Sequence, residues 1–353
     1  MRIQYNSVLM CLLYFPQICG LSLPDARRVI SALMPIVKVV RSLRDTLIPV
    51  LRKALFARST EVKQIGLFGV LQMLKNFHIK SALPVTQMSQ SSAGLSQATA
   101  IIQRGQAASN DLICNELIGV LRRALTQKAA VRLVMYQGLY DVVSRNPELC
   151  VSVQDVLYQH AIKNKWIESE KETKIIEVNK LVTTEELGAV VLDPVGWYLH
   201  CVQQLLTKAE QLNPNSGEQG DEGSEEDESA REKLTEMIMS LAEKYAKLEL
   251  VDLDFEKEAD YSRTTIQGEK NALSVDLLKN VYESLMEYVI THGADVSEDK
   301  AKLLLDLYEK HSDVAGLLKV LLIKHFIYYL KYIVNLQQTV LKLNTNSDIK
   351  LSS

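Results

Sequence analysis

Four Ser/Thr-Gln dipeptides are the residues of this chain whose type and spacing suit a defined chemistry. Three lie in one polar stretch and the fourth follows further along the chain: Thr86-Gln87, Ser89-Gln90, Ser96-Gln97 and Thr126-Gln127. Kinases of the DNA-damage checkpoint type require Gln directly after the hydroxyl that accepts the phosphate. The sequence therefore predicts phosphorylation at these four hydroxyls. The alternative is a Ser/Gln-rich linker that contains the dipeptides by chance.

A surplus of basic residues precedes the polar stretch. Between Pro24 and Lys80 the chain carries eleven Lys or Arg residues and three Asp or Glu residues, although its overall formal charge is −3. Such a patch can neutralise phosphates and bind nucleic acid in a salt-sensitive, sequence-independent way. The candidate DNA-binding residues are Arg41, Arg44, Arg52, Lys53 and Arg58. A solvated face or an acidic protein partner explains the same charges, and charge alone does not decide between them.

Phosphorylation would act on this basic surplus. Each phosphate adds about −1.5 to −2 charges, so three of them would nearly cancel the surplus of eight. The linker and the basic segment together therefore predict an electrostatic switch.

Lys63 stands out because of its position on a helical wheel. It falls on the apolar side of its predicted helix, with Leu67, Val70 and Leu74. A buried ammonium without a partner is costly, so two interpretations remain. Either the side chain snorkels to water from the helix start, or it lies at a contact that can open.

Residues for catalysis or metal binding are not combined in any recognisable pattern. The six histidines are scattered, and none stands at metal-ligand spacing from a cysteine. His200 and Cys201 are adjacent, so on a helix they point about 100° apart. The chain contains neither a phosphate-binding G-x-x-x-x-G-K-[ST] loop nor a G-x-S-x-G elbow. We expect no enzyme, no cofactor and no metal. A carboxylate and a histidine that face each other inside a pocket would be needed to support an enzymatic function.

The elements that must position these residues are predicted to be helices. Gly and Pro together are few, 15 and 8 of 353 residues, which argues against a many-stranded sheet protein. Apolar residues recur at a three-four spacing, and residues 165–192, with their β-branched runs, remain ambiguous. Helices are predicted over 23–40, 43–56, 59–77, 110–126, 129–145, 150–162 and 193–212, with three or four more between 231 and 345. The fold class is all-α, an irregular α-solenoid of antiparallel helix pairs like ARM or HEAT repeats. A compact helical bundle is the competing fold.

The same reading divides the chain into segments. They are basic helical repeats with Lys63 (1–77), a flexible Ser/Thr-Gln linker (78–108), a helical region (109–212), an acidic disordered insert (213–230), a second helical region (231–345) and a polar tail (346–353). The apolar run from Val8 to Leu13 could be a signal peptide, but Tyr14 to Gln17 interrupt it and a buried helix is favoured. The sequence contains no uninterrupted run of about 18 apolar residues, so we expect no membrane-spanning helix. Five widely spaced cysteines suit reduced thiols of a cytosolic or nuclear protein.

Several long segments, in order along the chain, carry a family resemblance. They are Leu43–Ala57, Leu74–Phe77, Leu121–Gln127, Val131–Val142, Asp193-Pro194, Glu218–Glu228 and Glu258–Ser262. Together they resemble the middle of the Fanconi anemia group I family, over about residues 22–290. The family's proteins are several times longer, so we expect the chain to be part of such a protein.

The resemblance implies a specific function. A member of this family is a nuclear α-solenoid subunit that pairs with a paralogous Fanconi partner. The heterodimer clamps DNA at stalled forks and interstrand crosslinks, under the control of a checkpoint kinase and of a ubiquitin ligase with its conjugating enzyme. Thr86, Ser89 and Ser96 match the family's phosphorylated cluster, with Thr in place of Ser at the first site and a one-residue displacement at the third. Thr126 matches a further Gln-directed site.

The resemblance also implies a ubiquitin acceptor. A gapless comparison between Phe56 and Phe77 puts Gln64 where the family has its lysine and Lys63 where it has arginine. We assign the acceptor to Lys63, the nearest lysine, one residue away from the family's position. The competing hypothesis for the whole chain is a generic helical-repeat adaptor whose basic face meets an acidic protein partner.

Overall fold

The computed structural model describes residues 15–77, 97–168, 172–212, 230–292 and 298–318, and the side chains of α6 from residue 110 onward. Thr86, Ser89 and Ser96 lie outside these residues. So do the apolar run near the N-terminus, nearly all of the acidic insert and the polar tail.

The N-terminal part is a row of short helices. After η1 (Phe15–Gly20) come α2 (Leu23–Val39), α3 (Arg41–Leu55) and α4 (Thr60–Asn76), as the apolar spacing predicted. Ser22 caps α2 by accepting a hydrogen bond from the Asp25 amide, and Ser59 caps α4 through the Val62 amide. A side-chain oxygen at these positions satisfies an amide that the helix itself leaves unbonded, which fixes where each helix begins.

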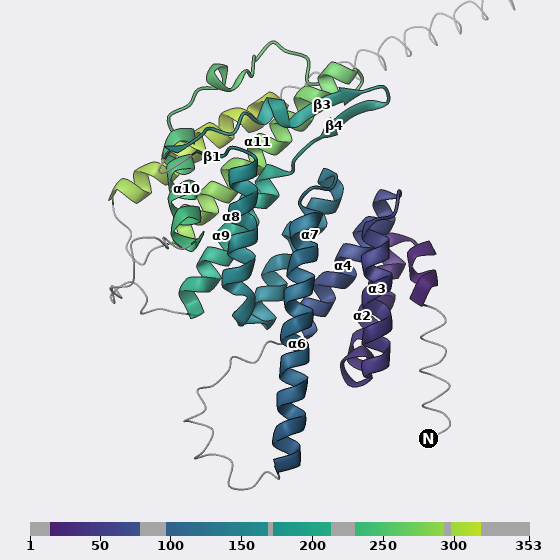
Figure 1. The fold of residues 1–353 in the computed structure, drawn as a ribbon. Coiled ribbons are helices and arrows are strands. Elements are labelled where there is room, and N and C mark those ends of the chain that lie inside the picture. Colours follow the sequence, from purple (N-terminus) through teal and green to yellow (C-terminus); the bar gives the residue numbers. More distant parts are fainter. Residues whose placement is uncertain (1–14, 78–96, 169–171, 213–229, 293–297, 319–353) are drawn as a thin grey trace, which may run out of the picture.

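The first of the next three helices is much longer than the others and corrects a predicted boundary. The three are α6 (Gln97–Ala124), α7 (Ala129–Arg145) and α8 (Cys150–Lys163), with η2 (Pro147–Leu149) before α8. Residues 97–108 are helical, so the linker predicted over 78–108 is wrong in its second part. This segment is rich in alanine, a strong helix former, but has no sustained apolar face. Figure 1 shows the N-terminal half of α6 extending beyond the neighbouring helices.

Successive helices pack as a solenoid requires. Helix α4 contacts α2, α3 and α7. Near its start, Gln64 Nε2 donates to Ala130 O at 2.9 Å, and near its end Lys75 Nζ lies 2.6 Å from Asp141 Oδ2. The residue numbers of the contacts increase together along both helices, from 64 and 130 to 75 and 141. Helices α4 and α7 therefore run parallel, as equivalent helices of neighbouring repeats do. Figure 1 shows α2, α3, α4 and α7 arranged one after another.

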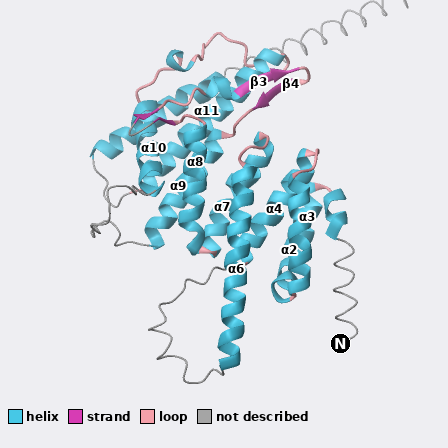
Figure 2. Ribbon diagram, viewed as in Figure 1, coloured by secondary structure: helices cyan, strands magenta, loops and turns pink. Residues whose placement is uncertain are grey.

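Short strands and the remaining helices complete the fold. The strands β1 (Ile167–Glu168) and β2 (Glu172–Thr173) pair antiparallel, as do β3 (Val182–Glu185) and β4 (Gly188–Val191) after η3 (Val178–Leu181). The strand pair β3–β4 packs on α11 (Ile266–Thr291). Helices α9 (Val195–Leu212) and α10 (Ala230–Tyr245), η4 (Val251–Leu253) and a helix over 298–318 form the rest. Figure 2 shows how little of the described chain is strand.

The buried side chains form one continuous core that runs from Phe15 to Leu317. Because each helix buries its apolar face against its neighbours in the row, the all-α solenoid is confirmed over the compact bundle. None of the described helices is long and apolar enough to cross a membrane.

Candidate functional site

Lys63 lies at a contact between two repeats. It occupies the start of α4, is half-buried, and its Nζ donates a hydrogen bond to Gln127 Oε1 at 2.7 Å. The acceptor is a neutral amide, so the ammonium is held without a counter-charge in this bond. The Lys63 side chain therefore does not extend only to water but bonds to a neighbouring helical repeat.

Gln127 belongs to the predicted phosphorylation site Thr126-Gln127. The two residues form the turn between α6 and α7, and their amides donate to Arg123 O and Ala124 O. Thr126 is exposed and its hydroxyl donates to Arg123 O at 2.8 Å. The structure therefore brings together the candidate ubiquitin acceptor and one candidate phosphate acceptor, which are 63 residues apart in the sequence.

Two further side chains hold the same turn in place. Gln64, the neighbour of Lys63, bonds to Ala130 O in the first turn of α7. Arg132 donates to Leu125 O, directly after the end of α6, at 3.4 Å. The backbone of the turn is thus fixed independently of the Lys63 contact.

The candidate DNA-binding residues do not form one free surface. Arg44 is only 9% exposed, with its guanidinium over the Phe77 ring and a hydrogen bond to Asn110 Oδ1 at 3.4 Å. Because Arg44 is one of the buried residues of α3, it supports packing rather than a phosphate contact. Arg41 is exposed but lies 3.6 Å from Asp45 Oδ2.

The remaining three candidates differ in their surroundings. Arg52 pairs with Glu116 on α6, with Nη1 2.6 Å from Oε1. Lys53 and Arg58 are exposed, and no ion pair to either is formed by an acidic residue of the described segments. Beside Arg52, the side chains of Arg123 and Gln127 line a small hollow next to Phe56, which is 69% exposed.

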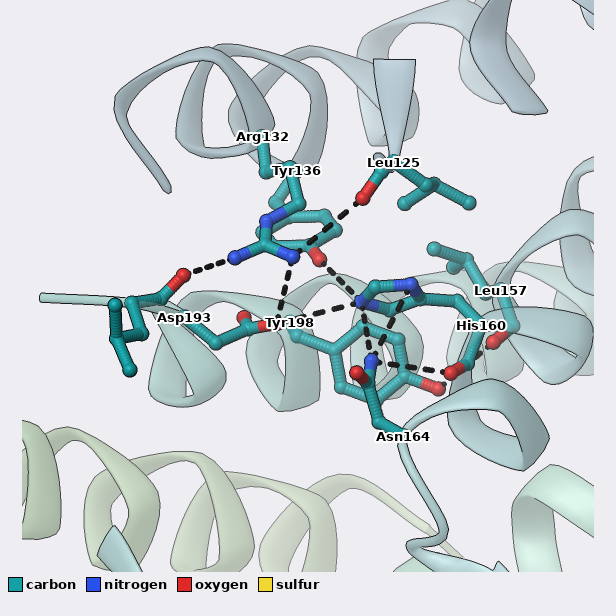
Figure 3. Close-up of polar contacts among 9 residues, drawn as sticks. Leu125, Arg132, Tyr136, Leu157, His160, Asn164, Asp193 and Tyr198 are labelled. Atoms are coloured by element: carbon teal, nitrogen blue, oxygen red, sulfur yellow. Dashed lines mark hydrogen bonds and ion pairs between the residues drawn. The ribbon is translucent and has the colours of Figure 1, made fainter. Parts of the chain in front are cut away.

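A second polar cluster is buried between α7, α8 and α9 (Figure 3). Asp193 Oδ2 lies 3.2 Å from Arg132 Nη1 and 3.5 Å from His160 Nε2. Nε2 also lies 3.0 Å from the Tyr136 hydroxyl, and Asn164 lies within hydrogen-bond distance of the ring. Figure 3 shows these side chains pointing toward one another.

This cluster contains an acid-His pair of the kind that an enzyme would need, but the pair is buried and, among the described residues, does not line a pocket. The side chains of His160 and Asp193 are 2% and 5% exposed, and the clefts near α11 and η4 are lined by other residues. Burial and the Asp193 charge raise the pKa of Tyr136 well above its ordinary value, so the phenol stays protonated. The cluster ties three helices together. No sequence pattern reveals this cluster, because it joins residues that are far apart in the sequence and belong to different helices and the segments that flank them.

The described cysteines and possible metal ligands show no arrangement that suits catalysis or metal binding. Cys19, Cys114, Cys150 and Cys201 are free thiols, and burial raises the pKa of each, that of Cys114 to about 11. Such thiols are poor nucleophiles at neutral pH. Among the described residues, no group of three or more His, Cys, Asp or Glu is placed to hold a metal ion.

Comparison with known proteins covers most of the chain. The family description "FANCI solenoid 2" matches residues 4–71, and "FANCI helical domain 2" matches residues 85–319. The mouse (Mus musculus) Fanconi anemia group I protein homolog is 33% identical over 305 residues, which is 85% of this chain and 23% of the mouse protein. The chicken (Gallus gallus) Fanconi anemia group I protein is 30% identical over 306 residues, 86% of this chain and 23% of the chicken protein. This chain thus spans about a quarter of the length of these relatives.

These matches confirm the resemblance inferred from the long segments. One family description, a helical domain, alone covers more than half of the residues, and it agrees with the helical fold. The chain belongs to the Fanconi anemia group I protein family.

Proposed function

We propose that this chain is the regulated central part of a non-enzymatic nuclear subunit that binds DNA during interstrand crosslink repair. In this proposal it acts within a heterodimer with a paralogous Fanconi partner. A checkpoint kinase phosphorylates Thr86, Ser89, Ser96 and Thr126, and a ubiquitin ligase with its conjugating enzyme modifies Lys63.

The observation that carries the proposal is the contact between Lys63 and Gln127 in a chain of this family. An acceptor lysine that is half-buried and bonded to a Gln-directed site is reached more easily when this contact opens, which suits a modification that depends on assembly state. Family membership supports the repair role, because the mouse and chicken relatives carry the name Fanconi anemia group I protein.

For the DNA contact, the surroundings of the cations favour Lys53 and Arg58. Both are exposed, whereas Arg44 is buried and Arg41 and Arg52 lie next to carboxylates. A cation already paired with a carboxylate gains less from a phosphate, because it must give up its partner first.

A titration of duplex and branched DNA at two salt concentrations tests this assignment. The double variant Lys53→Gln/Arg58→Gln is expected to bind more weakly and to lower the slope of log affinity against log salt by about 1 to 2. The matched control is Lys163→Gln/Lys165→Gln, which removes two exposed cations near the end of α8. Salt-independent binding, no binding by the chain, or an equal loss in the control contradicts the proposal.

The competing adaptor function is favoured by one feature, the exposed Phe56 ring beside Arg52 and Arg123. An aromatic side chain flanked by arginines is typical of a surface that binds a protein. If Phe56→Ser removes binding of an acidic protein while DNA affinity is unchanged, and damage leaves the Ser/Thr-Gln sites unmodified, the adaptor is the better description.

A further inference from the structure

We propose that Lys63 masks Gln127 from the kinase, so that acylation of Lys63 makes Thr126 a better phosphate acceptor. The inference rests on the proposed function, because it takes Lys63 as a ubiquitin acceptor and Thr126 as a Gln-directed site. It adds an order of events that neither site implies alone.

The first step is the state of Gln127 in the folded chain. A kinase that requires Gln after the acceptor must bind that side-chain amide. Here the amide oxygen already accepts a hydrogen bond from the Lys63 ammonium at 2.7 Å. Thr126 itself is exposed, so access to the hydroxyl is not the obstacle. The side chain that the kinase must recognise is thus bonded to Lys63, whereas the acceptor residue Thr126 is exposed and its hydroxyl bonds to Arg123 O within its own turn.

The second step is what acylation does to this bond. The Lys63 ammonium loses a proton, and the resulting amine attacks the carbonyl carbon of the thioester at the C-terminus of ubiquitin. An amide bond forms, the thiol leaves, and the nitrogen keeps one hydrogen and no charge. The hydrogen bond to Gln127 loses its charge assistance and is weakened, because a neutral amide is a weaker donor than an ammonium.

The third step is that the turn remains folded when the bond is weakened. Arg132 still donates to Leu125 O, and Gln64 still donates to Ala130 O. The Gln127 amide still donates to Ala124 O. Only the side chain of Gln127 is held less tightly, and it becomes more available to the kinase next to an exposed Thr126.

The test is the initial rate of Thr126 phosphorylation in the whole chain by a purified Gln-directed kinase, measured by mass spectrometry. Lys63→Met removes the donor and keeps the side-chain length, and the rate is expected to rise by about tenfold or more, as expected for the loss of one charge-assisted hydrogen bond. Lys63→Arg keeps a cationic donor and is expected to stay close to the original rate. Phosphorylation of Ser89 in the same samples is the internal reference.

Lys75→Met is the matched control. Lys75 also joins α4 to α7, through Asp141, but at the far end of the helix pair. If it raises the Thr126 rate as much as Lys63→Met does, the effect is a general loosening and the masking is overturned. Equal rates in all variants overturn the masking and leave Thr126 as a kinase site. No phosphate on Thr126 in any variant overturns both proposals.

A second measurement tests the contact through the reactivity of the Lys63 amine and needs no kinase. Labelling of the Lys63 amine by an acylating reagent is expected to rise several-fold in Gln127→Leu, because the bond to Oε1 is removed. Gln64→Leu, which removes the neighbouring bond to Ala130 O, is expected to change it little. Equal labelling of Lys63 in the original chain and in Gln127→Leu overturns the masking.

Discussion

Two cations on neighbouring elements show how burial changes the role of a charged residue. Lys63 is half-buried and bonds to a neutral amide, so breaking its contact leaves no buried carboxylate without a counter-charge. Arg132 has a side chain that is only 11% exposed, and it lies next to the carboxylate of Asp193. Removing one partner of a buried pair leaves the other charge uncompensated. We therefore expect Arg132 to matter for stability and Lys63 for regulation.

Replacing Arg132 by Met is expected to lower the free energy of unfolding by about 3 to 5 kcal/mol, because the buried Asp193 carboxylate loses its counter-charge. Urea denaturation followed by circular dichroism measures the loss. The double variant Arg132→Met/Asp193→Leu is expected to recover much of it, since neither charge remains buried. A loss below about 1 kcal/mol in the single variant would contradict this view of the cluster.

At the scale of the elements, close approach between helices depends on glycine at a few positions. A Cβ atom on Gly66 of α4 would lie 2.8 Å from both Leu51 O and the Cβ of Ala54 on α3. Because one of these atoms belongs to the backbone, the two helices would have to move apart. Gly119 of α6 has open space where its Cβ would lie.

Gly66→Ala is therefore expected to destabilise the chain by about 1 to 3 kcal/mol. Gly119→Ala is expected to be neutral or to stabilise it by up to about 1 kcal/mol, because alanine favours the helix. Thermal denaturation of the two variants compares them directly. Equal changes in both would mean that helix propensity, rather than the α3–α4 contact, decides the outcome.

Helix prediction succeeded where local signals were strong. Asp193-Pro194 precedes α9 directly, and the caps at Ser22 and Ser59 stand next to clear apolar periodicity. The strand pair β3–β4 stayed ambiguous because it depends on packing against α11, which is far away in the sequence. The start of α6 was missed because alanine-rich helix propensity carries no periodic pattern.

The site could be predicted only in part for a similar reason. The helical wheel placed Lys63 on the apolar side of its helix, and the residue is indeed half-buried. Its partner Gln127 is 64 residues away, and His160 is 33 residues from Asp193. No local pattern specifies such pairs, because they follow from how whole helices are stacked.

At the scale of the whole molecule, we expect added phosphate to weaken DNA binding by charge. A chain phosphorylated at its Ser/Thr-Gln sites is expected to bind DNA less tightly than the unmodified chain. The difference should be larger at about 50 mM than at about 200 mM salt, because screening weakens repulsion between the phosphates and the DNA. Fluorescence anisotropy of labelled duplex measures both affinities. The variant in which all four acceptors are replaced by Ala, treated with the same kinase, is the control. Unchanged or tighter binding after phosphorylation would rule out the electrostatic switch.

The length of α6 has a mechanical consequence. Its 28 residues span about 42 Å, and its C-terminal end is attached to the turn that Lys63, Gln64 and Arg132 hold. A rigid rod pivoting at that end by about 5° would carry Gln97 through nearly 4 Å, by the rod's length. A small rearrangement beside Thr126 would then produce a larger displacement at Gln97, the other end of the helix. Gln97 directly follows the segment that carries Thr86, Ser89 and Ser96.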